Sequence, residues 1–293
     1  MAKSSNNIFV RLRDGVVLGV LLCGCITAPA TAGEDPATDS LWEMNLAAFG
    51  RFGPSYPASE ETQRDFIPLP FPVYRGTFFR LGDDTESPMR GRVFRTERIK
   101  LDIDFDLIFG SDSDDIAART GMPDLDLLLE AGPELELQFV DRGWFDTDAF
   151  LALPLRAAFS WDGLDPSFEG LVFAPELKFT RDFGNDHRQL KFRITPLFAS
   201  DGYMDYYYEV RPAFATADRP AFTADGGYLG SEIALSLRWP VANRLELWGG
   251  VRQGFYTGAT NEDSPLFTDD TTTTIYAAFM YRFWESKRRA AAD

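Results

Sequence analysis

Alternation of apolar and charged residues between Ile99 and Phe109 is the feature that most restricts what this chain can fold into. Apolar side chains hold the odd positions, and Ile108 is the single apolar residue at an even position. The other even positions are charged, namely Lys100, Asp102, Asp104 and Asp106. Side chains of a β-strand point alternately to its two faces, whereas a helix would scatter them around its circumference. The segment is therefore predicted to be a strand with one apolar and one charged face.

Such a strand fits two environments. In a soluble sandwich or barrel the apolar face packs inward, and in an outer-membrane barrel it meets lipid while the charged face lines a wet interior. Aromatic residues make up 14% of the chain and include 26 phenylalanines. Aromatic girdles are common at the two interfaces of a membrane barrel, so the composition favours the second environment.

Charge and hydropathy exclude other classes. The formal net charge of −16 and the pI near 4.5 argue against a nucleic-acid partner, which needs a basic surface. The mean hydropathy is −0.20, and beyond the N-terminus no apolar run approaches the roughly 20 residues of a spanning helix. If the chain spans a membrane it must do so as a closed barrel, because an open sheet edge is not tolerated in lipid.

Residues 1–32 are predicted to be a secretory signal peptide that is removed. Its parts are a basic start with Lys3, Arg11 and Arg13, an apolar core from Val16 to Ile26, and the cleavage site Ala30-Thr31-Ala32. The mature chain would then begin at Gly33. A rival cut is the lipoprotein-like Leu22-Cys23-Gly24-Cys25, in which Cys25 would be lipidated. With the preferred cut both cysteines are lost, which excludes disulfides and thiol chemistry in the mature protein.

The mature chain, 33–293, is predicted to be one all-β domain, with 285–293 a polar C-terminal tail. The expected strands are 42–52, 73–81, 92–109, 133–140, 146–159, 168–181, 190–198, 203–211, 228–239, 245–256 and 275–284. The proline-rich run Ile67–Pro72 is interpreted as a crossing outside the sheet, because proline donates nothing to the ladder. The apolar stretch Leu125–Leu129 is interpreted as a brief helix.

Strand length and spacing then define the architecture. Most candidates are about ten residues long and alternate between short turns and longer polar loops, which is typical of membrane barrels and not of sandwiches. Aromatic residues gather near the expected strand ends, namely Trp42, Phe52, Trp144, Trp161, Tyr203, Trp239, Tyr256 and Trp284. The prediction is a single antiparallel transmembrane β-barrel of 12 strands, with 10 as the alternative.

Several breaks in the pattern resemble a known family. Gly53-Pro54-Ser55-Tyr56-Pro57-Ala58-Ser59 and Pro68-Leu69-Pro70-Phe71-Pro72-Val73-Tyr74-Arg75 resemble the opening signature of the MipA/OmpV family of outer-membrane proteins. Later landmarks occur in the same order: Gly132-Pro133, Leu153-Pro154-Leu155-Arg156, Tyr206-Tyr207, Gly226-Gly227 and Asp263-Ser264-Pro265-Leu266. Family chains usually stop at the aromatic end of the last strand, here Tyr281-Arg282-Phe283, whereas this chain continues to Asp293.

The resemblance implies a Gram-negative outer-membrane barrel that reaches its location through the periplasm. Its named member is a scaffold that brings a murein transglycosylase together with a murein synthase, and other members are linked to solute or antibiotic passage. The leading prediction is therefore a non-enzymatic scaffold for peptidoglycan machinery, which also contacts outer-membrane lipid and lipopolysaccharide. The alternative is a narrow pore for small solutes.

No catalytic, cofactor-binding or metal residue is predicted. The single histidine, His187, lies in a polar turn and is interpreted as a solvated turn residue instead of a general base. No Gly-x-Ser-x-Gly or Ser-x-x-Lys motif occurs, and one histidine cannot build a histidine-based zinc site. Loop carboxylates could bind calcium weakly, but solvated side chains are the preferred interpretation for Asp112, Asp114, Asp115, Asp269 and Asp270.

The candidate functional residues are charges that alternation places inside the barrel: Asp102, Asp104, Asp106, Glu134, Glu136, Lys178, Lys191 and Arg193. The three aspartates could line a cation-selective lumen. The preferred alternative is that they pair with Lys178, Lys191 or Arg193 and fill the interior. The basic cluster Lys287–Arg289 could touch anionic lipid or murein, although a frayed tail is the preferred reading.

Overall fold

A computed structural model describes residues 39–82, 89–162, 165–184 and 188–290. The chain divides into two units, Met1–Gly33 and Glu34–Asp293, and the account below concerns the second. The predicted signal peptide with both cysteines, the turn containing Asp83 and Asp84, and His187 all lie outside the described residues. Among the described residues, no helix is both long and apolar enough to cross a membrane.

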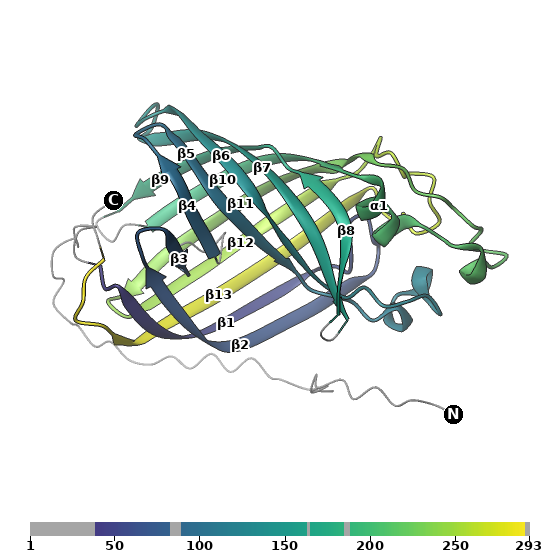
Figure 1. The fold of residues 1–293 in the computed structure, drawn as a ribbon, viewed down its shortest axis with the longest axis horizontal. Coiled ribbons are helices and arrows are strands. Elements are labelled where there is room, and N and C mark those ends of the chain that lie inside the picture. The colour runs from purple at the N-terminus through teal and green to yellow at the C-terminus, as the bar shows by residue number, and fades with distance from the viewer. Residues whose placement is uncertain (1–38, 83–88, 163–164, 185–187, 291–293) are drawn as a thin grey trace. The chain divides into compact units, whose positions relative to one another are not determined.

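One antiparallel sheet contains all the described strands (Figure 1). Its segments are β1 (Trp42–Pro54), β2 (Thr62–Arg75), β3 (Phe79–Leu81), β4 (Met89–Arg95), β5 (Ile99–Ile108), β6 (Leu127–Val140), β7 (Thr147–Asp162), β8 (Asp165–Phe173), β9 (Glu176–Phe183), β10 (Arg188–Ala199), β11 (Gly227–Ala242), β12 (Leu245–Phe255) and β13 (Thr271–Glu285). Helix α1 (Asp201–Tyr208) is the one α-helix of the described residues.

The sheet closes on itself because β1 pairs with both β2 and β13 and β10 pairs with β11. Segments β8 and β9 both pair with β7 and with β10, so they are two halves of one strand. The chain is interrupted between them at Ala174 and Pro175. Counting them as one turns the 13 segments into 12 strands, and the predicted 12-stranded antiparallel barrel is confirmed.

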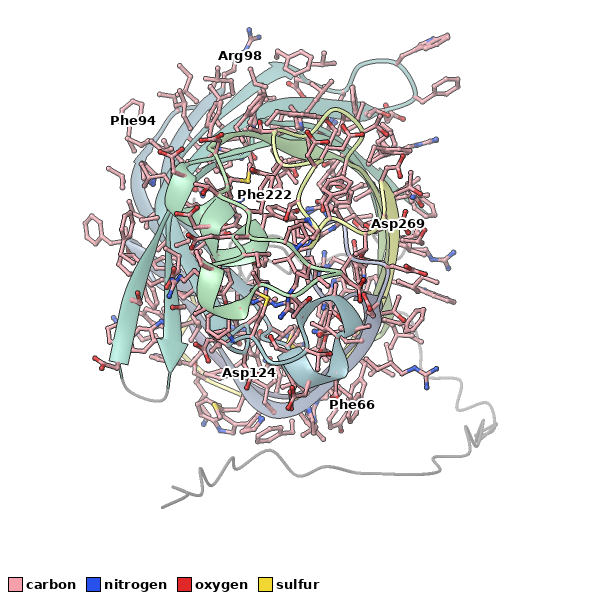
Figure 2. All side chains as sticks on the ribbon, turned by 90° about the vertical axis from the view of Figure 1, so that its right-hand side faces the viewer. Phe66, Phe94, Arg98, Asp124, Phe222 and Asp269 are labelled. Carbon is pink, nitrogen blue, oxygen red and sulfur yellow. The ribbon has the colours of Figure 1, made fainter. Side chains whose placement is uncertain are left out.

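The alternation that defines β5 separates an outer from an inner face. Leu107 is 40% exposed and Ile99 is 41% exposed, whereas Asp102 between them in sequence is 4% exposed. Phe66 and Phe94, on β2 and β4, project from the outside of the ring when the barrel is viewed from the end that carries α1 (Figure 2). Apolar side chains outside and polar side chains inside are the arrangement that lipid requires of a barrel wall.

The two ends of the barrel differ. Short turns lie at one end, at 76–78, 96–98, 141–146 and 243–244, together with the last residues of β9, the first residues of β10 and the described ends of the chain at Asp39 and Ala290. Longer segments lie at the other end, at 55–61, 109–126, 200–226 and 256–270, and α1 belongs to them (Figure 1). We call these four segments the cap.

The cap has a hydrophobic core of its own. Its buried members come from all four segments and from the adjoining strand ends, and include Tyr56, Ile116, Leu125, Leu128, Tyr203, Met204, Tyr207, Tyr208, Val210, Ala224 and Leu266. Phe222 packs against this cluster and lies over the interior of the ring in Figure 2. Loops that bury such a core behave as a folded layer and not as solvated connections.

The last described residues are paired, contrary to the frayed tail that the sequence favours. The Leu41 amide donates to the Arg288 carbonyl (2.8 Å), the Ala290 amide donates to the Asp39 carbonyl (2.8 Å), and Ser40 forms a bridge with Arg289. Residues 286–290 therefore continue the pairing of β13 with the chain that leads into β1.

The proline-rich run is a strand, and the predicted crossing at Ile67–Pro72 is wrong. The Arg75 amide donates to the Leu41 carbonyl (2.9 Å), so the odd-numbered residues of β2 bond to the β1 side. Pro68, Pro70 and Pro72 have even numbers, and their nitrogens therefore face away from β1. The backbone N–H groups that these prolines lack would all point to the edge of β2 that faces away from β1, and proline is tolerated at such an edge.

The predicted strand 92–109 is two strands. Its halves are β4 and β5, and they are joined by Thr96-Glu97-Arg98, a turn without glycine or proline. The Thr96 hydroxyl accepts the Ile99 amide (3.0 Å), which closes the turn through a side chain.

Two other local predictions are also wrong. Residues 203–211 are largely helical in α1 and not a strand, because Tyr203 and Tyr207 stand four residues apart and both enter the cap core. The expected helix at Leu125–Leu129 is extended, and Leu127 begins β6. Short 3₁₀ turns precede it at Ser113–Asp115 and Ala117–Arg119.

Candidate functional site

Arg156 is the centre of a cluster of acids inside the barrel. Its guanidinium lies 3.4 Å from Glu130, 3.5 Å from Asp104 and 3.3 Å from Asp106. The arginine comes from β7, Glu130 from β6 and the two aspartates from β5, so the cluster ties three neighbouring strands together. Glu130 is 2% exposed, and an acid so enclosed needs such a partner to remain charged.

Glu136 joins a second cluster nearer the short-turn end. Its two carboxylate oxygens lie 2.7 Å from the Lys100 ammonium and 2.6 Å from the Lys178 ammonium. Both ammonium groups also sit over the Phe150 ring, at 5.4 and 5.5 Å from its centre. Lys100 is on β5 and Lys178 is on β9, so Glu136 links strands that lie on either side of β7 and β6.

The remaining predicted residues lie in the same part of the wall. Asp102 pairs with Arg95 at 3.0 Å, and Arg193 approaches Glu176 at 3.8 Å. Glu134 lies opposite Asp102 in the ladder, and Lys191 lies opposite Thr180 and Ser236. The structure thus brings Asp102 to Arg95, and Asp104 and Asp106 to Arg156. Neither arginine stands out in the sequence, because the partner of a lumen charge depends on strand register.

The rest of the wall has a different inner surface. Three-strand rows run across β13, β1 and β2, with Ala278 opposite Phe49 and Phe49 opposite Ile67, and with Met280 opposite Ala47 and Ala47 opposite Leu69. Directly opposed residues share a face of the sheet. Ile67 and Leu69 lie on the same face of β2 as Asp65 and Arg75, and Phe66 lies on the outer face, so these rows face the interior. We call these six residues the apolar strip. The interior is therefore charged along β5–β10, whereas along β13–β2 these two apolar rows lie between the ion pairs Arg51–Asp65 and Glu43–Arg282.

Polar contacts join the cap to the wall and join the segments of the cap to one another. The Tyr203 hydroxyl donates to the Glu130 carboxylate (2.9 Å), which joins α1 to the Arg156 cluster. Arg119 is 4% exposed and donates to the Tyr207 carbonyl (3.1 Å) and to the Pro123 carbonyl (3.2 Å). The Tyr56 hydroxyl donates to the Leu266 carbonyl (2.6 Å). These bonds satisfy groups that would otherwise be buried without partners.

Burial governs the ionisation of the cap tyrosines. It raises the pKa of Tyr56 to about 12, although the nearby Arg119 guanidinium acts in the opposite direction. Burial raises the pKa of other cap phenols in the same way, namely Tyr203, Tyr206, Tyr207 and Tyr208. The cap is thus assembled around neutral phenols.

The loop carboxylates considered for calcium serve the local backbone. Asp112 accepts the Asp114 amide (3.0 Å), and Asp269 accepts the Thr271 amide (2.9 Å). Within the residues that the structure describes, no group of three or more histidine, cysteine, aspartate or glutamate side chains is arranged to bind a metal ion.

The outer face carries the expected aromatic side chains at both ends of the strands. Trp42, Trp239 and Trp284 lie at the short-turn end, Phe52 and Trp161 lie at the cap end, and each is at least a third exposed. Trp144 lies in the turn 141–146 and is 87% exposed. Tyr203 and Tyr256 do not belong to these girdles, because both are buried at the cap.

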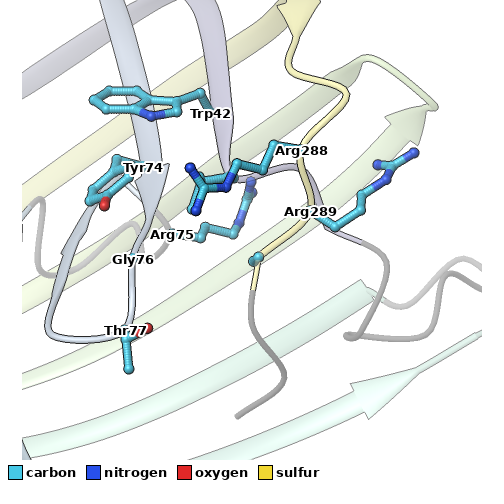
Figure 3. A pocket seen from close by; sticks show the side chains of 9 residues that line it. Trp42, Tyr74, Arg75, Gly76, Thr77, Arg288 and Arg289 are labelled. Atoms are coloured by element: carbon cyan, nitrogen blue, oxygen red, sulfur yellow. The ribbon is translucent and has the colours of Figure 1, made fainter.

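A pocket of about 370 Å³ lies at the short-turn end, where β1, β2 and the C-terminal residues meet. Figure 3 shows the Trp42 and Tyr74 rings side by side, with the Arg75 and Arg288 side chains next to them. Arg75 is held by Glu43 at 2.9 Å, whereas Arg288 and Arg289 are largely exposed. This end of the barrel therefore presents basic and aromatic groups to its surroundings.

A closed antiparallel barrel with an apolar, aromatic-banded outside and a charged inside defines an outer-membrane barrel protein. Residues 46–283 match the model of the family described as MltA-interacting protein MipA, and the chain belongs to this family. The resemblance seen in the sequence is confirmed, and so is location in the outer membrane of a Gram-negative cell.

Solved structures of outer-membrane barrels are similar to this chain at low sequence identity. The translocator domain of the autotransporter NalP from Neisseria meningitidis has 12% identity, covers 83% of this chain and 88% of its own, and gives a TM-score of 0.41. The CymD monoaromatic hydrocarbon channel has 10% identity, 87% and 91% coverage, and a TM-score of 0.34. Outer membrane phospholipase A from Escherichia coli has 9% identity, 82% and 92% coverage, and a TM-score of 0.34. A comparison with curated proteins finds no match.

Proposed function

We propose that this protein is a non-enzymatic scaffold of the outer membrane that holds murein-synthesising and murein-hydrolysing enzymes together. The description of its family, MltA-interacting protein, supports a murein transglycosylase as one partner. The observation that carries the proposal is the packed cap. A channel would need this core to open, whereas a scaffold needs only a rigid platform.

The partners would meet the short-turn end. In outer-membrane barrels the short turns face the periplasm and the longer loops face outward. Murein lies in the periplasm, so the surface available to its enzymes consists of the short turns and the paired residues 286–290. Arg288 and Arg289 are exposed there, beside the pocket lined by Trp42 and Tyr74.

Binding of the purified barrel to a purified murein transglycosylase, and separately to a murein synthase, tests the proposal. Arg288→Glu combined with Arg289→Glu should weaken binding, because it reverses the charge of the platform. Arg211→Glu is the matched control, since Arg211 is exposed at the opposite, cap end. Failure of the unaltered protein to bind either enzyme would contradict the scaffold.

A narrow pore for small solutes is the second candidate. It is favoured by Arg252, whose side chain remains 43% exposed although it reaches 3.5 Å from Glu232 on the neighbouring strand β11. Some solvent-accessible space therefore remains beside these charges. Conductance in a planar bilayer separates the two functions: the scaffold predicts small or absent current, and a large ohmic current lost on neutralising Asp102, Asp104 and Asp106 would establish the pore.

A further inference from the structure

The pocket at the short-turn end lies on the rim of the barrel, between its outer and inner faces. Trp42 lies opposite Tyr74 in the ladder, and Tyr74 is on the same outer face of β2 as Phe66. Arg75, the next residue of β2, is on the inner face, where Glu43 holds it at 2.9 Å. The volume of about 370 Å³ falls in the range of small-molecule sites, roughly 300–1,000 Å³. The pocket is therefore large enough for a ligand that touches both the lipid face and the rim.

Ser40 orients two of the arginines that line the pocket. It is 1% exposed, its carbonyl accepts the Arg75 guanidinium (3.0 Å), and its hydroxyl accepts the Arg289 guanidinium (3.2 Å). Arg75 is neutralised by Glu43, whereas among the described residues no acidic side chain pairs with Arg288 or Arg289. A guanidinium group binds phosphate and carboxylate through two parallel hydrogen bonds. This side of the pocket is therefore suited to an anion.

The opposite side of the pocket is aromatic. The Trp42 and Tyr74 ring centres lie 4.3 Å apart, next to the Arg288 side chain (Figure 3). Gly76 allows this arrangement, because a Cβ there would lie 2.6 Å from the Tyr74 ring. Tryptophan and tyrosine prefer the headgroup level of a bilayer, where one end of the ring is apolar and the other is wet. The pocket thus joins a lipid-facing aromatic pair to two guanidinium groups.

We propose that this pocket binds the phosphate headgroup of a glycerophospholipid from the inner leaflet of the outer membrane. Arg288 and Arg289 contact the phosphate oxygens, and the Trp42 and Tyr74 rings pack against the glycerol and the first carbons of the acyl chains. The short turns of such barrels face the periplasm, so the lipids beside this end belong to the inner leaflet. A soluble anion would use the arginines but would leave the aromatic pair uncovered.

Lipid binding to the purified protein tests the site. The protein is freed of lipid in detergent, and native mass spectrometry measures its affinity for dioleoylphosphatidylglycerol, for dioleoylglycerol, which lacks the phosphate, and for glycerol phosphate, which lacks the chains. The phospholipid should bind at least about tenfold more tightly than either other probe, because it alone contacts both sides of the pocket. No murein enzyme takes part, so the lipid site can fail while the proposed scaffold stands, and the reverse.

Two changes to the pocket should weaken binding of the phospholipid. Arg288→Gln combined with Arg289→Gln removes the contacts to the phosphate and should lower the affinity about 30-fold. Thr77→Asp keeps both arginines and adds a carboxylate to the turn that lines the pocket, so repulsion of the phosphate should lower the affinity as well. Arg98→Gln combined with Arg142→Gln is the matched control, because it removes the same charge from exposed turns at the same end. Heat-dependent gel mobility checks that all variants are folded.

Three results would overturn the proposal. Equal affinity for the phospholipid and for dioleoylglycerol would show that the phosphate is not recognised. Equal affinity for the phospholipid and for glycerol phosphate would identify a site for soluble anions. An affinity that the Arg288 and Arg289 changes leave unaltered, or that the control lowers equally, would place lipid binding elsewhere on the barrel.

Discussion

The wall and the cap of this barrel bury opposite kinds of side chain. The wall exposes Ile99 and Leu107 and encloses Asp102 and Glu130. The cap encloses tyrosines and aliphatic residues and leaves most of its charges exposed. The wall meets lipid outside and charges inside, whereas the cap is surrounded by water and needs an ordinary hydrophobic core. The wall therefore has apolar side chains outside and polar side chains inside, whereas the cap has the reverse arrangement. A substitution that is tolerated in one region should be costly in the other.

The largest expected effect is on the ladder between β1 and β2. Leu69→Pro should cost on the order of 3 kcal/mol or more, because it removes a bond to Ala47 within a membrane-embedded wall. Pro70→Ala, one residue away, should change stability by less than about 1 kcal/mol, because its nitrogen faces away from β1. Urea unfolding in lipid vesicles measures both. Equal costs would show that the edge assignment of the prolines is wrong.

The second effect tests the outer face of the wall. Ile103→Arg, in the middle of β5, should lose about 2–4 kcal/mol, because a cation on the lipid face is most costly at the bilayer midplane. Val241→Arg near the end of β11 is the matched control and should cost only about 0–1 kcal/mol. The same vesicle titration compares them. If both variants lose the same amount, depth in the membrane does not govern the wall.

The wall is the region that the sequence predicts best. Period-two alternation needs no knowledge of neighbours, and it locates β7 and the hairpin of β11 and β12 within a few residues. It also finds the second half of β6, and it finds β5 as part of a longer predicted strand. The pairs inside the wall are less predictable. Arg156 reaches acids on two other strands, and a shift of one residue in register would turn it to the lipid face.

The sequence predicts less of the cap and of the β2 edge. Aromatic residues such as Tyr203 and Tyr207 favour strands on average. Here the two tyrosines pack against each other and Tyr207 packs against Tyr56, and these contacts stabilise a helix instead. The sequence alone places the prolines of β2 outside the sheet, because a proline removes a ladder bond. That rule holds for strands paired on both sides, and only the pairing shows that the prolines lie on the side of β2 away from β1, which among the described residues bonds to β3 only at Tyr74 and Arg75.

The third effect is a pH limit that belongs to the cap. A phenol ordinarily ionises near pH 10, and burial raises the pKa of Tyr56 to about 12. Between these values an open cap would bind fewer protons than the closed one, so the stability of the cap falls as the pH rises and is complete below pH 10. Each shifted tyrosine contributes about 1.4 kcal/mol per pH unit.

Tyrosine absorbance and far-ultraviolet circular dichroism, followed together, measure this step. Ionisation of the cap phenols should precede any loss of strand signal, because the wall does not depend on them. Tyr56→Phe should move the step to higher pH. Simultaneous loss of both signals would mean that cap and wall unfold as one unit.

The smallest expected effect concerns the junction between the two regions. Tyr203→Phe removes the bond to Glu130 and should weaken docking of the cap by about 1–2 kcal/mol, because Glu130 keeps Arg156 as its partner. Tyr206→Phe is the matched control on the same helix. Its hydroxyl donates to the Asp126 carbonyl (2.8 Å), so the lost bond lies within the cap.

Limited proteolysis after Arg211 and Arg219 reports opening of the cap, and conductance reports access to the interior. Tyr203→Phe should increase proteolysis and conductance more than Tyr206→Phe does, because of the two variants only Tyr203→Phe removes a bond between the cap and the wall. Equal increases for the two variants would show that packing within the cap, and not the bond from Tyr203 to Glu130, keeps the cap closed.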